Sequence, residues 1–428
     1  MKYLYLKITS LTYSITVSLL NICLPILSLK IFGNQLFDNK KRSFYLDRKK
    51  NKNLIKNNEF EIFRTSKCSV VWFHCSSLGE FEQCKPLIQR IKKVFPQNKI
   101  ALTFFSPSGY SVAKNYPSVN WVGYLPLDIS KQMDLIIKFI NPKILILSKN
   151  DYWPNMLYEL EKQNVPVVSI STRFSHYDFF WSSWACWFKN ALNTINHFYV
   201  VNKESEKILK KNGISKITLA GDVRMDRVLN ILNQKKDLEI LTDFIGIDKY
   251  WVAGSTWIQD YPLFLDYVSK NKSHKVIIAP HDCSKKSIKL LTVNLKKSYV
   301  LWSKYSHEND NSKKILILDK VGILKYAYKY AEFVYIGGGM GKSGLHNILE
   351  AAVYDIPVII GKNYNRFPEA IDLIKKGGCF SVSDKFDFEE IVEKICKNLN
   401  FGRLINYKYI ENQKGATNKI FIGLKKYL

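Results

Sequence analysis

A glycine-rich turn between a buried strand and a helical segment constrains this chain more than any other feature. Residues 333–361 read FVYIGGGMGKSGLHNILEAAVYDIPVIIG, in which an apolar run leads into five glycines within eight positions. The apolar run is typical of a buried parallel strand, and the spacing of residues 346–353 predicts a helix. Glycines allow backbone N–H groups to approach a phosphate, and the start of a helix adds unpaired donors and the positive end of its dipole. We therefore predict that Gly339 and Gly341 lie beside a nucleotide phosphate.

Two other interpretations of this turn stay open at this point. Residues 339–344 match G-x-G-x-x-G, which is the fingerprint of a dinucleotide-binding fold. A dinucleotide-binding enzyme carries that motif in its first βα unit, with an acidic residue about twenty positions further on. Here most of the chain precedes the motif, and the following strand ends in an Ile-Ile-Gly run. A tight turn without a ligand would also need glycines, although His346, Asn347 and Glu350 offer polar groups for a ribose or a base.

Two domains are expected, because 428 residues exceed the size that one hydrophobic core usually organises. Hydrophobic residues make up 46% of the sequence, which is enough for two packed interiors and argues against general disorder. Short apolar runs separated by helical lengths are the pattern of a parallel α/β sheet. The first series of such runs comprises residues 69–73, 99–104, 120–124, 143–147, 166–170 and 197–201, and the second comprises residues 250–254, 275–280, 315–319, 333–337 and 357–361.

Each series predicts a Rossmann-like domain, and we expect the two domains to face each other across a central cleft. The predicted boundaries place an N-terminal domain at residues 67–230, a linker at 231–248, and a C-terminal domain with a closing helical tail at 249–428. Ligands of open α/β sheets bind beyond the carboxyl ends of the strands. The polar clusters described below all follow strand ends, which predicts that they form one site.

The first 66 residues differ in composition from the rest of the chain. Residues 8–29 contain no charged side chain and would span about 33 Å as a helix, which is enough to cross a bilayer. We predict a membrane anchor at residues 1–32, with an interfacial helix and a secretory signal as the alternatives. Residues 33–66 are polar and basic and form a predicted juxtamembrane connector. The positive-inside rule then places the following domains in the cytoplasm.

The net charge of +27 raises the question of an anionic partner. Lysines are spread along the chain, and no zinc finger, RNA-binding sheet motif or basic zipper occurs, so we predict no nucleic-acid partner. A membrane face rich in anionic lipid suits the same charge. The eight cysteines include no C-x-x-C pair and no histidine at metal-ligand spacing, which predicts reduced thiols in a reducing compartment, without a disulfide or a zinc site.

Three polar side chains of the first series are candidates for catalysis. Glu80 follows the first run at the predicted start of a helix, where the dipole favours the ionised carboxylate that a general base needs. A capping box with Ser77 explains the same residue without any catalytic role. Asp151 follows the fourth run and could orient a sugar hydroxyl or cap a loop. Arg224 could neutralise a leaving phosphate, or the charged residues that follow it could simply pair at the surface.

Two strand ends of the second series also carry polar groups. Ser255 and Thr256 follow a glycine and suit contacts to a phosphate or carboxylate. Pro280 and His281 end the next run, where a lone histidine on a loop is more often structural than functional. None of these motifs is specific when it is taken singly.

Taken in order, the motifs resemble those of the bacterial 3-deoxy-D-manno-octulosonic acid (Kdo) transferases. The matching stretches are SSLGEFEQ, FSPSGY, WPN, GDVRMDRV, GSTW, APH, the glycine turn, HNILE and NRFPEA, which together cover about residues 60–380. The N-terminal membrane segment is similar as well. The resemblance implies a GT-B glycosyltransferase that transfers Kdo from CMP-Kdo to a lipid A precursor with inversion. The alternatives are a GT-B transferase that uses a UDP-sugar on another membrane lipid, and a non-enzymatic basic protein that binds a membrane surface. The resemblance further implies a single-pass anchor in the inner membrane, cytoplasmic catalytic domains, an acceptor-binding N-terminal domain and a CMP-sugar-binding C-terminal domain.

The resemblance also implies roles for individual residues. Glu80 matches the general base of the family, and Asp151 and Arg224 match positions that stabilise the transition state. The stretches that contact CMP match Pro280, His281, Val321, Gly322, Ile323, Asn347, Ile348, Leu349 and Glu350. The family usually has Glu at the positions of Asp151 and Asp282, and often at Ile323, so one carboxylate is a methylene shorter here and one nucleotide contact is expected to be backbone only.

No cofactor and no metal ion are expected in the reaction. A nucleotide monophosphate leaving group needs a preorganised positive environment, which backbone donors and Arg224 supply where other glycosyltransferases use a divalent cation. A D-x-D motif would indicate the metal route, and none occurs in this sequence. The implied partners are the CMP-Kdo donor, the lipid A precursor and the anionic lipids of the inner membrane.

Overall fold

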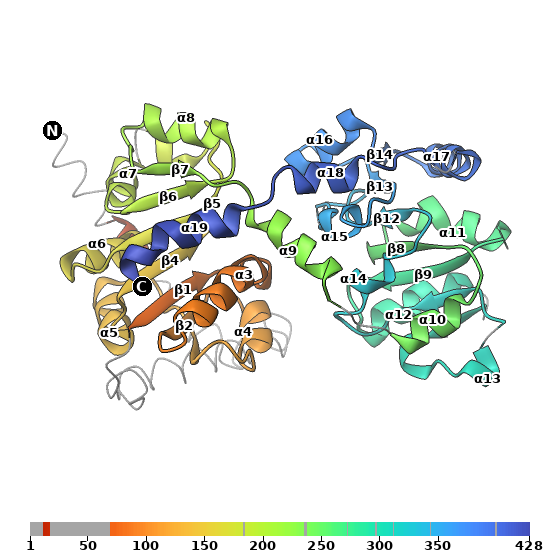
Figure 1. Cartoon of the computed structure of the whole chain (residues 1–428), viewed down its shortest axis with the longest axis horizontal. Helices are drawn as coiled ribbons and strands as arrows, with labels where there is room; N and C mark the ends of the chain where they lie inside the picture. Colours follow the sequence, from red (N-terminus) through yellow and green to blue (C-terminus); the bar gives the residue numbers. More distant parts are fainter. Residues whose placement is uncertain are drawn as a thin grey trace. The chain divides into compact units, whose positions relative to one another are not determined.

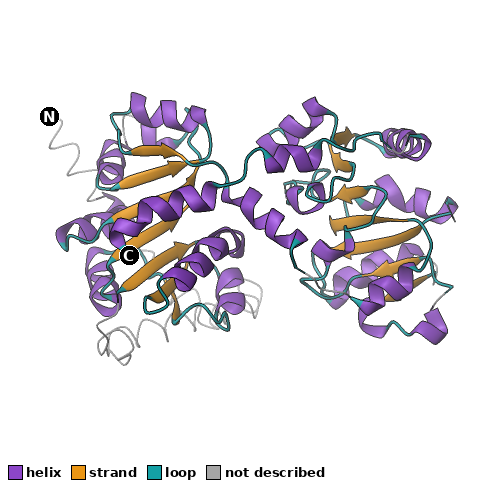
Figure 2. Ribbon diagram, in the orientation of Figure 1, coloured by secondary structure: helices purple, strands orange, loops and turns teal. Residues whose placement is uncertain are grey.

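The computed structural model of the chain describes residues 12–17, 69–182, 185–234, 238–271, 273–295, 298–310, 312–342, 344–398 and 400–428. The chain divides into two compact units, Met1–Arg227 with Gly415–Leu428 and Val228–Lys414. Each unit contains a seven-stranded sheet whose described strands all pair in parallel, with helices packed against it (Figures 1 and 2). This confirms the predicted α/β class with two Rossmann-like domains.

The sheet of the first unit has the order β3-β2-β1-β4-β5-β6-β7. Its strands are β1 (Val70–Cys75), β2 (Lys99–Phe104), β3 (Trp121–Tyr124), β4 (Ile144–Ser148), β5 (Val167–Thr172), β6 (His197–Val200) and β7 (Ile217–Leu219). Its helices are α3 (Leu78–Val94), α4 (Pro107–Ala113), α5 (Ser130–Ile140), α6 (Pro154–Lys162), α7 (Cys186–Asn193), α8 (Lys203–Lys211) and α19 (Ala416–Leu424), with 3-10 turns at Phe179–Trp181 and Lys425–Tyr427. Helix α9 (Val223–Leu232) carries the chain into the second unit.

Apolar side chains form a core on each face of this first sheet. On one face, Trp72 and Leu145 pack among residues of α5, α6, α7 and α8. On the other face, Phe73 and Ile146 pack among residues of α3, α4 and α19. Because successive side chains of a strand point to opposite faces, a strand between two helix layers has to be largely apolar, and every residue of β1 and β4 is buried.

The sheet of the second unit has the order β10-β11-β9-β8-β12-β13-β14. Its strands are β8 (Tyr250–Thr256), β9 (Lys275–Pro280), β10 (Tyr299–Leu301), β11 (Ile315–Ile317), β12 (Val334–Ile336), β13 (Val358–Gly361) and β14 (Cys379–Val382). Its helices are α10 (Glu239–Ile245), α11 (Tyr261–Lys270), α12 (Lys285–Thr292), α13 (His307–Asp310), α14 (Leu324–Ala327), α15 (Leu349–Ala352), α16 (Pro368–Lys376), α17 (Lys385–Lys397) and α18 (Asn406–Glu411), with 3-10 turns at Val293–Leu295 and Trp302–Lys304. Helix α10 lies within the predicted linker at 231–248.

The eleven predicted strands are confirmed, each to within two residues at its ends. Three strands, β7, β10 and β14, were not predicted. Each has three or four residues and lies at the edge of a sheet, where it has one neighbour. An edge strand is partly exposed and needs no continuous apolar run, so these segments lack the pattern that marks a buried strand.

The C-terminal tail was predicted to close the second domain, but it packs on the first unit. Helix α19 contacts α3, and its apolar face is buried in the core of the first unit. The Asp226 carboxylate accepts the backbone N–H groups of Gly415 and Thr417, each at 2.6 Å, and so holds the start of α19. Arg227 pairs with Glu82 at 3.3 Å. The GDVRMDRV motif thus anchors the chain terminus as well as carrying Arg224.

Most of the predicted membrane anchor and all of the basic connector lie outside the described residues. Residues 12–17 form a short helical segment that packs on the first unit. The ring centres of Tyr13 and Trp187 lie 4.7 Å apart, and the Tyr13 hydroxyl donates to the Asp128 Oδ2 at 2.8 Å. In the parts of the chain that the structure describes, no helix is both long and apolar enough to cross a membrane.

Asp128 is a buried carboxyl group that holds the start of α6. Its oxygens accept the backbone N–H groups of Asn155 and Met156 at 2.9 and 2.8 Å, which are donors that have no carbonyl partner within the helix. Burial raises the pKa of Asp128 to about 6, although the hydrogen bonds from Asn155 and Tyr13 oppose part of this effect. The ionised carboxylate is therefore less favourable in the folded chain than in the unfolded chain.

We expect this carboxyl group to make stability depend on pH. Because the folded-state pKa lies above the ordinary value, its contribution is present below about pH 4 and is lost as the pH rises through 6. The loss is on the order of 3 kcal/mol in the free energy of unfolding. Urea unfolding of the wild type and of Asp128→Asn, measured at pH 4, 5, 6 and 7, should show this decline in the wild type and not in the variant. Parallel curves would contradict the assignment.

Candidate functional site

Each sheet reverses its strand order at one point, and several of the predicted site residues follow the strands that flank it. In the first sheet the reversal lies between β1 and β4, and in the second it lies between β8 and β12. Glu80 and Asp151 follow β1 and β4, whereas Thr256 ends β8 and Gly339 follows β12. Parallel strands that leave such a point in opposite directions open a crevice between their carboxyl ends, which is where ligands of α/β sheets bind.

Glu80 lies in the first turn of α3 and makes the contacts of a capping box. Its Oε2 accepts the Ser77 backbone N–H at 3.2 Å, while the Ser77 side chain accepts the backbone N–H of Glu80. The capping interpretation of this residue is therefore confirmed as a description of its contacts. The other carboxylate oxygen, Oε1, lies 4.0 Å from the Lys149 ammonium, so one oxygen holds the helix and the other faces a cation.

The surroundings of Glu80 shift its acidity in the direction that a general base needs. Burial raises the pKa of Glu80 above its usual value, the Lys149 charge lowers it, and the Asp151 charge raises it, with a net increase. A carboxylate with a raised pKa is a stronger base and still ionises near neutral pH. Lys149 has a positive φ of 59°, an uncommon backbone conformation for a residue with a side chain.

Asp151 is held by groups from β1. The buried His74 ring places Nε2 2.7 Å from the Asp151 Oδ2, and its other nitrogen lies 2.9 Å from the Thr103 hydroxyl. The Ser76 hydroxyl also donates to Asp151. Burial raises the pKa of Asp151, but the contacts with His74 and the hydrogen bond from Ser76 lower it by more than burial raises it. The net pKa is therefore below the usual value. Asp151 is therefore ionised at neutral pH.

Arg224 lies at the start of α9, paired with a buried acid. Its Nε and Nη2 donate to the Asp222 Oδ2 at 2.9 and 2.7 Å. Burial raises the pKa of Asp222, but the Arg224 charge and its hydrogen bonds more than offset this effect. The pair fixes the orientation of the guanidinium group and neutralises part of its charge.

Three aromatic rings from three strand ends stack in the second unit. Trp257 follows β8, His281 follows β9, and His346 lies in the loop after β12. The His281 ring centre lies 4.7 Å from that of Trp257 and 4.2 Å from that of His346, with interplanar angles of 27° and 20°. The Trp257 Nε1–H donates to the His346 Nε2 at 2.8 Å. Burial and the neighbouring His281 lower the pKa of His346 to about 4, so this ring is neutral at pH 7.

The helix predicted at residues 346–353 is shorter than expected. Helix α15 spans only Leu349–Ala352, and both His346 and Asn347 precede it. The His346 backbone N–H donates to the Gly337 carbonyl at 3.2 Å, which together with the Trp257 contact keeps this residue in the loop. A four-residue helix offers little dipole, so the part of the anion-site prediction that relied on a helix start is wrong.

Close backbone packing explains several glycines of the turn. A Cβ on Gly337 would lie 2.5 Å from the Ser255 carbonyl oxygen, and a Cβ on Gly339 would lie 2.8 Å from the Gly361 backbone nitrogen. Gly341 differs, because the nearest atom to its Cβ would be a Gln259 side-chain atom at 3.5 Å, an ordinary contact. Packing therefore requires Gly337 and Gly339, whereas Gly341 has room that a bound group could fill.

Asp260 holds this turn in place, and the sequence analysis did not single it out. The buried carboxylate accepts the backbone N–H groups of Trp257 and Gly338 at 2.8 and 3.0 Å and the Tyr335 hydroxyl at 2.8 Å. It connects the end of β8 to the turn after β12. The sequence offered one signal for this role, an aspartate three residues after the GSTW motif. The same spacing also occurs at ordinary helix starts, so it does not identify the contact.

The remaining predicted nucleotide contacts differ in how accessible they are. Thr256 is buried, with its hydroxyl 3.5 Å from the Ala279 carbonyl, and Ile348 and Leu349 are also buried. Val321 is 87% exposed, in the turn between β11 and α14. The Asn347 side chain accepts the Leu349 N–H and donates to Glu350. The buried members of this set can offer a ligand at most their backbone groups.

Comparisons with known proteins identify the relationship. The model of the family described as 3-deoxy-D-manno-octulosonic-acid transferase (kdotransferase) matches residues 41–227. The 3-deoxy-D-manno-octulosonic acid transferase of Haemophilus influenzae is 25% identical over 393 residues, covering 84% of this chain and 87% of the relative. The enzyme of the same name from Chlamydophila psittaci is 24% identical, and the match covers 84% of this chain and 85% of the relative. These similarities support the predicted resemblance to the bacterial Kdo transferases.

The Kdo transferase relatives indicate that the chain is a glycosyltransferase. A bifunctional glycosyltransferase/methyltransferase of Fusobacterium nucleatum is 27% identical, and the chain spans 56% of the length of that relative. Solved structures show the same fold at low identity. The UDP-GlcNAc 2-epimerase of Neisseria meningitidis has a TM-score of 0.60 at 13% identity over 83% of this chain and 98% of that one. MurG of Acinetobacter baumannii has a TM-score of 0.53 at 8% identity, and the match covers 84% of this chain and 99% of MurG.

Two alanine substitutions test the packing argument for the glycine turn of this transferase. Gly337→Ala should lower the melting temperature by about 4–8 °C, because its Cβ would meet a backbone oxygen and cost about 2 kcal/mol. Gly341→Ala, the matched control in the same turn, should melt within about 2 °C of the wild type. Differential scanning calorimetry measures both. Equal melting temperatures for the two variants would show that the close contact at Gly337 does not limit the fold.

Proposed function

We propose that this chain is an inverting transferase that moves Kdo from CMP-Kdo to a lipid A precursor, without a metal ion in the reaction. The observation that carries the proposal is the pair of carboxyl groups at the reversal point of the first sheet. Glu80 has a raised pKa and Asp151 a lowered one. Neighbouring acids whose pKa values are pushed apart are typical of sites in which one group accepts a proton and the other remains charged.

In this proposal Glu80 is the general base. Inversion at the anomeric carbon requires the acceptor hydroxyl to attack from the face opposite the leaving group, and a base must remove its proton as the bond forms. Lys149, 4.0 Å from the Glu80 carboxylate, favours the ionised form that can accept this proton. Asp151, held by His74, supplies negative charge near the oxocarbenium-like centre that forms as CMP departs.

The leaving CMP is proposed to bind at the carboxyl edge of the second sheet. The flat stack of Trp257, His281 and His346 offers a surface for the cytosine or ribose, and Gly341 leaves room beside the glycine turn. Backbone groups of residues 321–323 and 347–350 and the Ser255 hydroxyl are further proposed contacts. Arg224 is proposed to stabilise the phosphate charge in the transition state.

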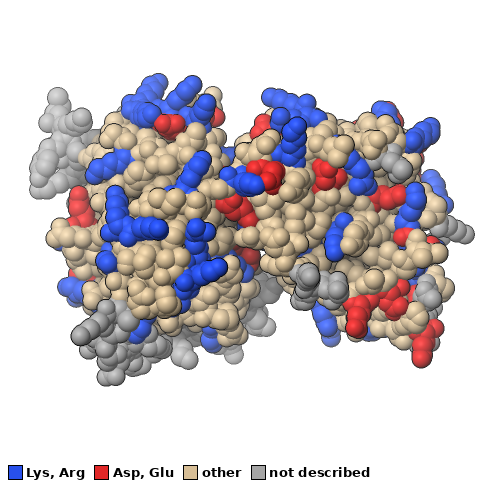
Figure 3. Space-filling view, in the orientation of Figure 1, with Lys and Arg blue, Asp and Glu red and all other residues tan. Residues whose placement is uncertain are grey.

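Transfer requires the donor and the acceptor hydroxyl to meet, so the proposal includes the GT-B arrangement with a cleft between the two domains. It also includes work at the cytoplasmic face of the inner membrane, since the acceptor is a lipid. On the face drawn in Figure 3, Lys and Arg side chains are dispersed rather than gathered into one patch. Dispersed positive charge is compatible with a weak, salt-dependent attraction to anionic lipid.

Donor choice and metal dependence can be tested in one assay. Full-length protein in vesicles containing a lipid A precursor should transfer Kdo from CMP-Kdo, detected by mass spectrometry of the lipid, and should not transfer sugar from UDP-GlcNAc. The rate should stay within about twofold in EDTA, because protein groups rather than a cation stabilise the leaving group. Transfer from the UDP-sugar would refute the donor assignment. Loss of turnover in EDTA that magnesium restores would refute the metal-free mechanism.

Glu80→Gln separates a base from a helix cap. Glutamine retains the size and the capping contact but cannot accept a proton, so turnover should fall by about 10²- to 10⁴-fold while the melting temperature stays close to that of the wild type. In the wild type, turnover should decline as the pH falls, with a midpoint above the ordinary glutamate value because the Glu80 pKa is raised. Glu82→Gln, on the same helix, is the matched control and should keep wild-type turnover. A folded, fully active Glu80→Gln protein would exclude the base.

A further inference from the structure

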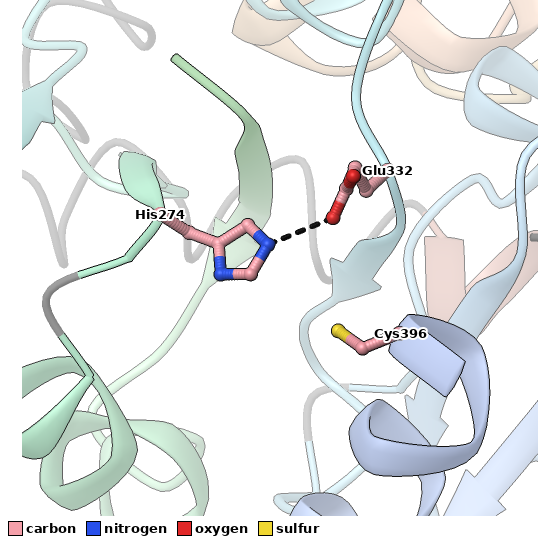
Figure 4. A group of neighbouring side chains, drawn as sticks. All are labelled: His274, Glu332 and Cys396. Atoms are coloured by element: carbon pink, nitrogen blue, oxygen red, sulfur yellow. Dashed lines mark hydrogen bonds and ion pairs between the residues drawn. The ribbon is translucent and has the colours of Figure 1, made fainter.

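A histidine, a glutamate and a cysteine from three distant segments meet in the second unit, away from the nucleotide-binding turn. His274 precedes β9, Glu332 precedes β12, and Cys396 lies in the last turn of α17. Figure 4 shows their side chains directed toward one another. One potential ligand atom of each residue lies within 4.8 Å of the other two. We propose that these three residues bind a zinc ion.

The position of this cluster separates it from the proposed reaction. His274 and Glu332 lie at the amino ends of their strands, whereas the nucleotide contacts follow the carboxyl ends of the same sheet. A metal here would therefore join β9, β12 and α17 rather than touch the sugar donor. Glu332 and Lys249 also line a cavity of about 1250 Å³.

The hydrogen bonds around His274 leave the nitrogen that faces Glu332 suited to a cation. The Asn271 Oδ1 accepts the Ser273 backbone N–H at 3.0 Å, and it also accepts the Ser273 hydroxyl at 2.6 Å. Since that hydroxyl has no second proton, the His274 Nδ1, 2.8 Å from it, has to be the donor of their hydrogen bond. The His274 Nε2 then presents a lone pair toward the Glu332 Oε2, which lies 2.8 Å away.

Two acceptors at that distance need a positive charge between them. A divalent cation bound between them supplies this charge. A hydrogen bond from the other ring nitrogen is the usual way in which a metal-binding histidine is fixed in orientation. Ser273 has this role here, and Asn271 in turn fixes Ser273.

The charges and donor types favour zinc over other common ions. A Cys396 thiolate and a Glu332 carboxylate balance two positive charges, and neutral His274 completes three ligands. Sulfur, nitrogen and oxygen together suit zinc, whereas magnesium and calcium prefer oxygen alone. Lys249 lies 2.9 Å from the Glu332 Oε1, so this cation occupies one carboxylate oxygen and leaves Oε2 for the metal. A water molecule would complete tetrahedral coordination.

Zinc binding by purified full-length protein tests the proposal. After chelation and dialysis, the wild type should bind zinc tightly at one site and gain melting temperature when zinc is added. Cys396→Ser, a change at an exposed position, should fold normally and lose at least about 100-fold in affinity, because even outer partners of metal ligands change affinity by about 10- to 100-fold. Cys186→Ser is the matched control and should bind as the wild type does.

Cobalt gives a direct test of the ligands. Cobalt added to the chelated protein should produce the near-ultraviolet thiolate-to-cobalt absorption in the wild type and in Cys186→Ser, and not in Cys396→Ser. His274→Gln should keep that band but weaken binding. Equal zinc affinity in Cys396→Ser and Cys186→Ser, or a cobalt complex without the thiolate band, would overturn the site. These readouts do not depend on transferase activity.

Discussion

The contact between His74 and Asp151 joins the two strands on which the proposed site of the first unit depends. It joins the end of β1 to the loop after β4, the pair between which the sheet reverses its order. Burial raises the pKa of Asp151, but the contacts with His74 and Ser76 outweigh this effect, so the partly buried carboxylate is ionised. Burial raises the pKa of Glu80, the Lys149 ammonium group lowers it, and the fixed negative charge of Asp151 adds to the increase. The acidity of each carboxyl group therefore follows from where the strands end.

A second buried carboxylate organises the corresponding point of the other sheet. Asp260 accepts hydrogen bonds from Trp257, Gly338 and Tyr335, and so connects the end of β8 to the glycine turn after β12. The turn can approach β8 closely because Gly337 has no side chain. With the turn held, the Trp257 ring meets the His281 and His346 rings in a stack. In both units a carboxylate, Asp151 or Asp260, fixes loops that come from strands far apart in the sequence.

The two ends of the second sheet have different chemical properties. Its carboxyl ends carry backbone groups, neutral rings and room beside Gly341, which suit a nucleotide. Its amino ends carry His274, Glu332 and Lys249, which are polar and charged groups linked to one another through the Glu332 carboxylate. In a parallel sheet all loops that follow the carboxyl ends of the strands lie on one side, and all loops that precede the amino ends lie on the opposite side. A function at the carboxyl ends therefore leaves the amino ends free for a different function.

The sequence by itself determined the α/β class and eleven strands, because buried parallel strands require continuous apolar runs. Its ordered motifs also indicated the resemblance to the Kdo transferases that the comparisons support. It also located Glu80, Asp151 and the glycine turn at strand ends. Only the tertiary structure decided that α19 returns to the first unit, that α15 is short, and that His74 and Asp260 hold the loops. Each of these depends on contacts between segments distant in sequence, which leave no local period or spacing. The meeting of His274, Glu332 and Cys396 is of the same kind, since three ligands on separate elements have no sequence signature.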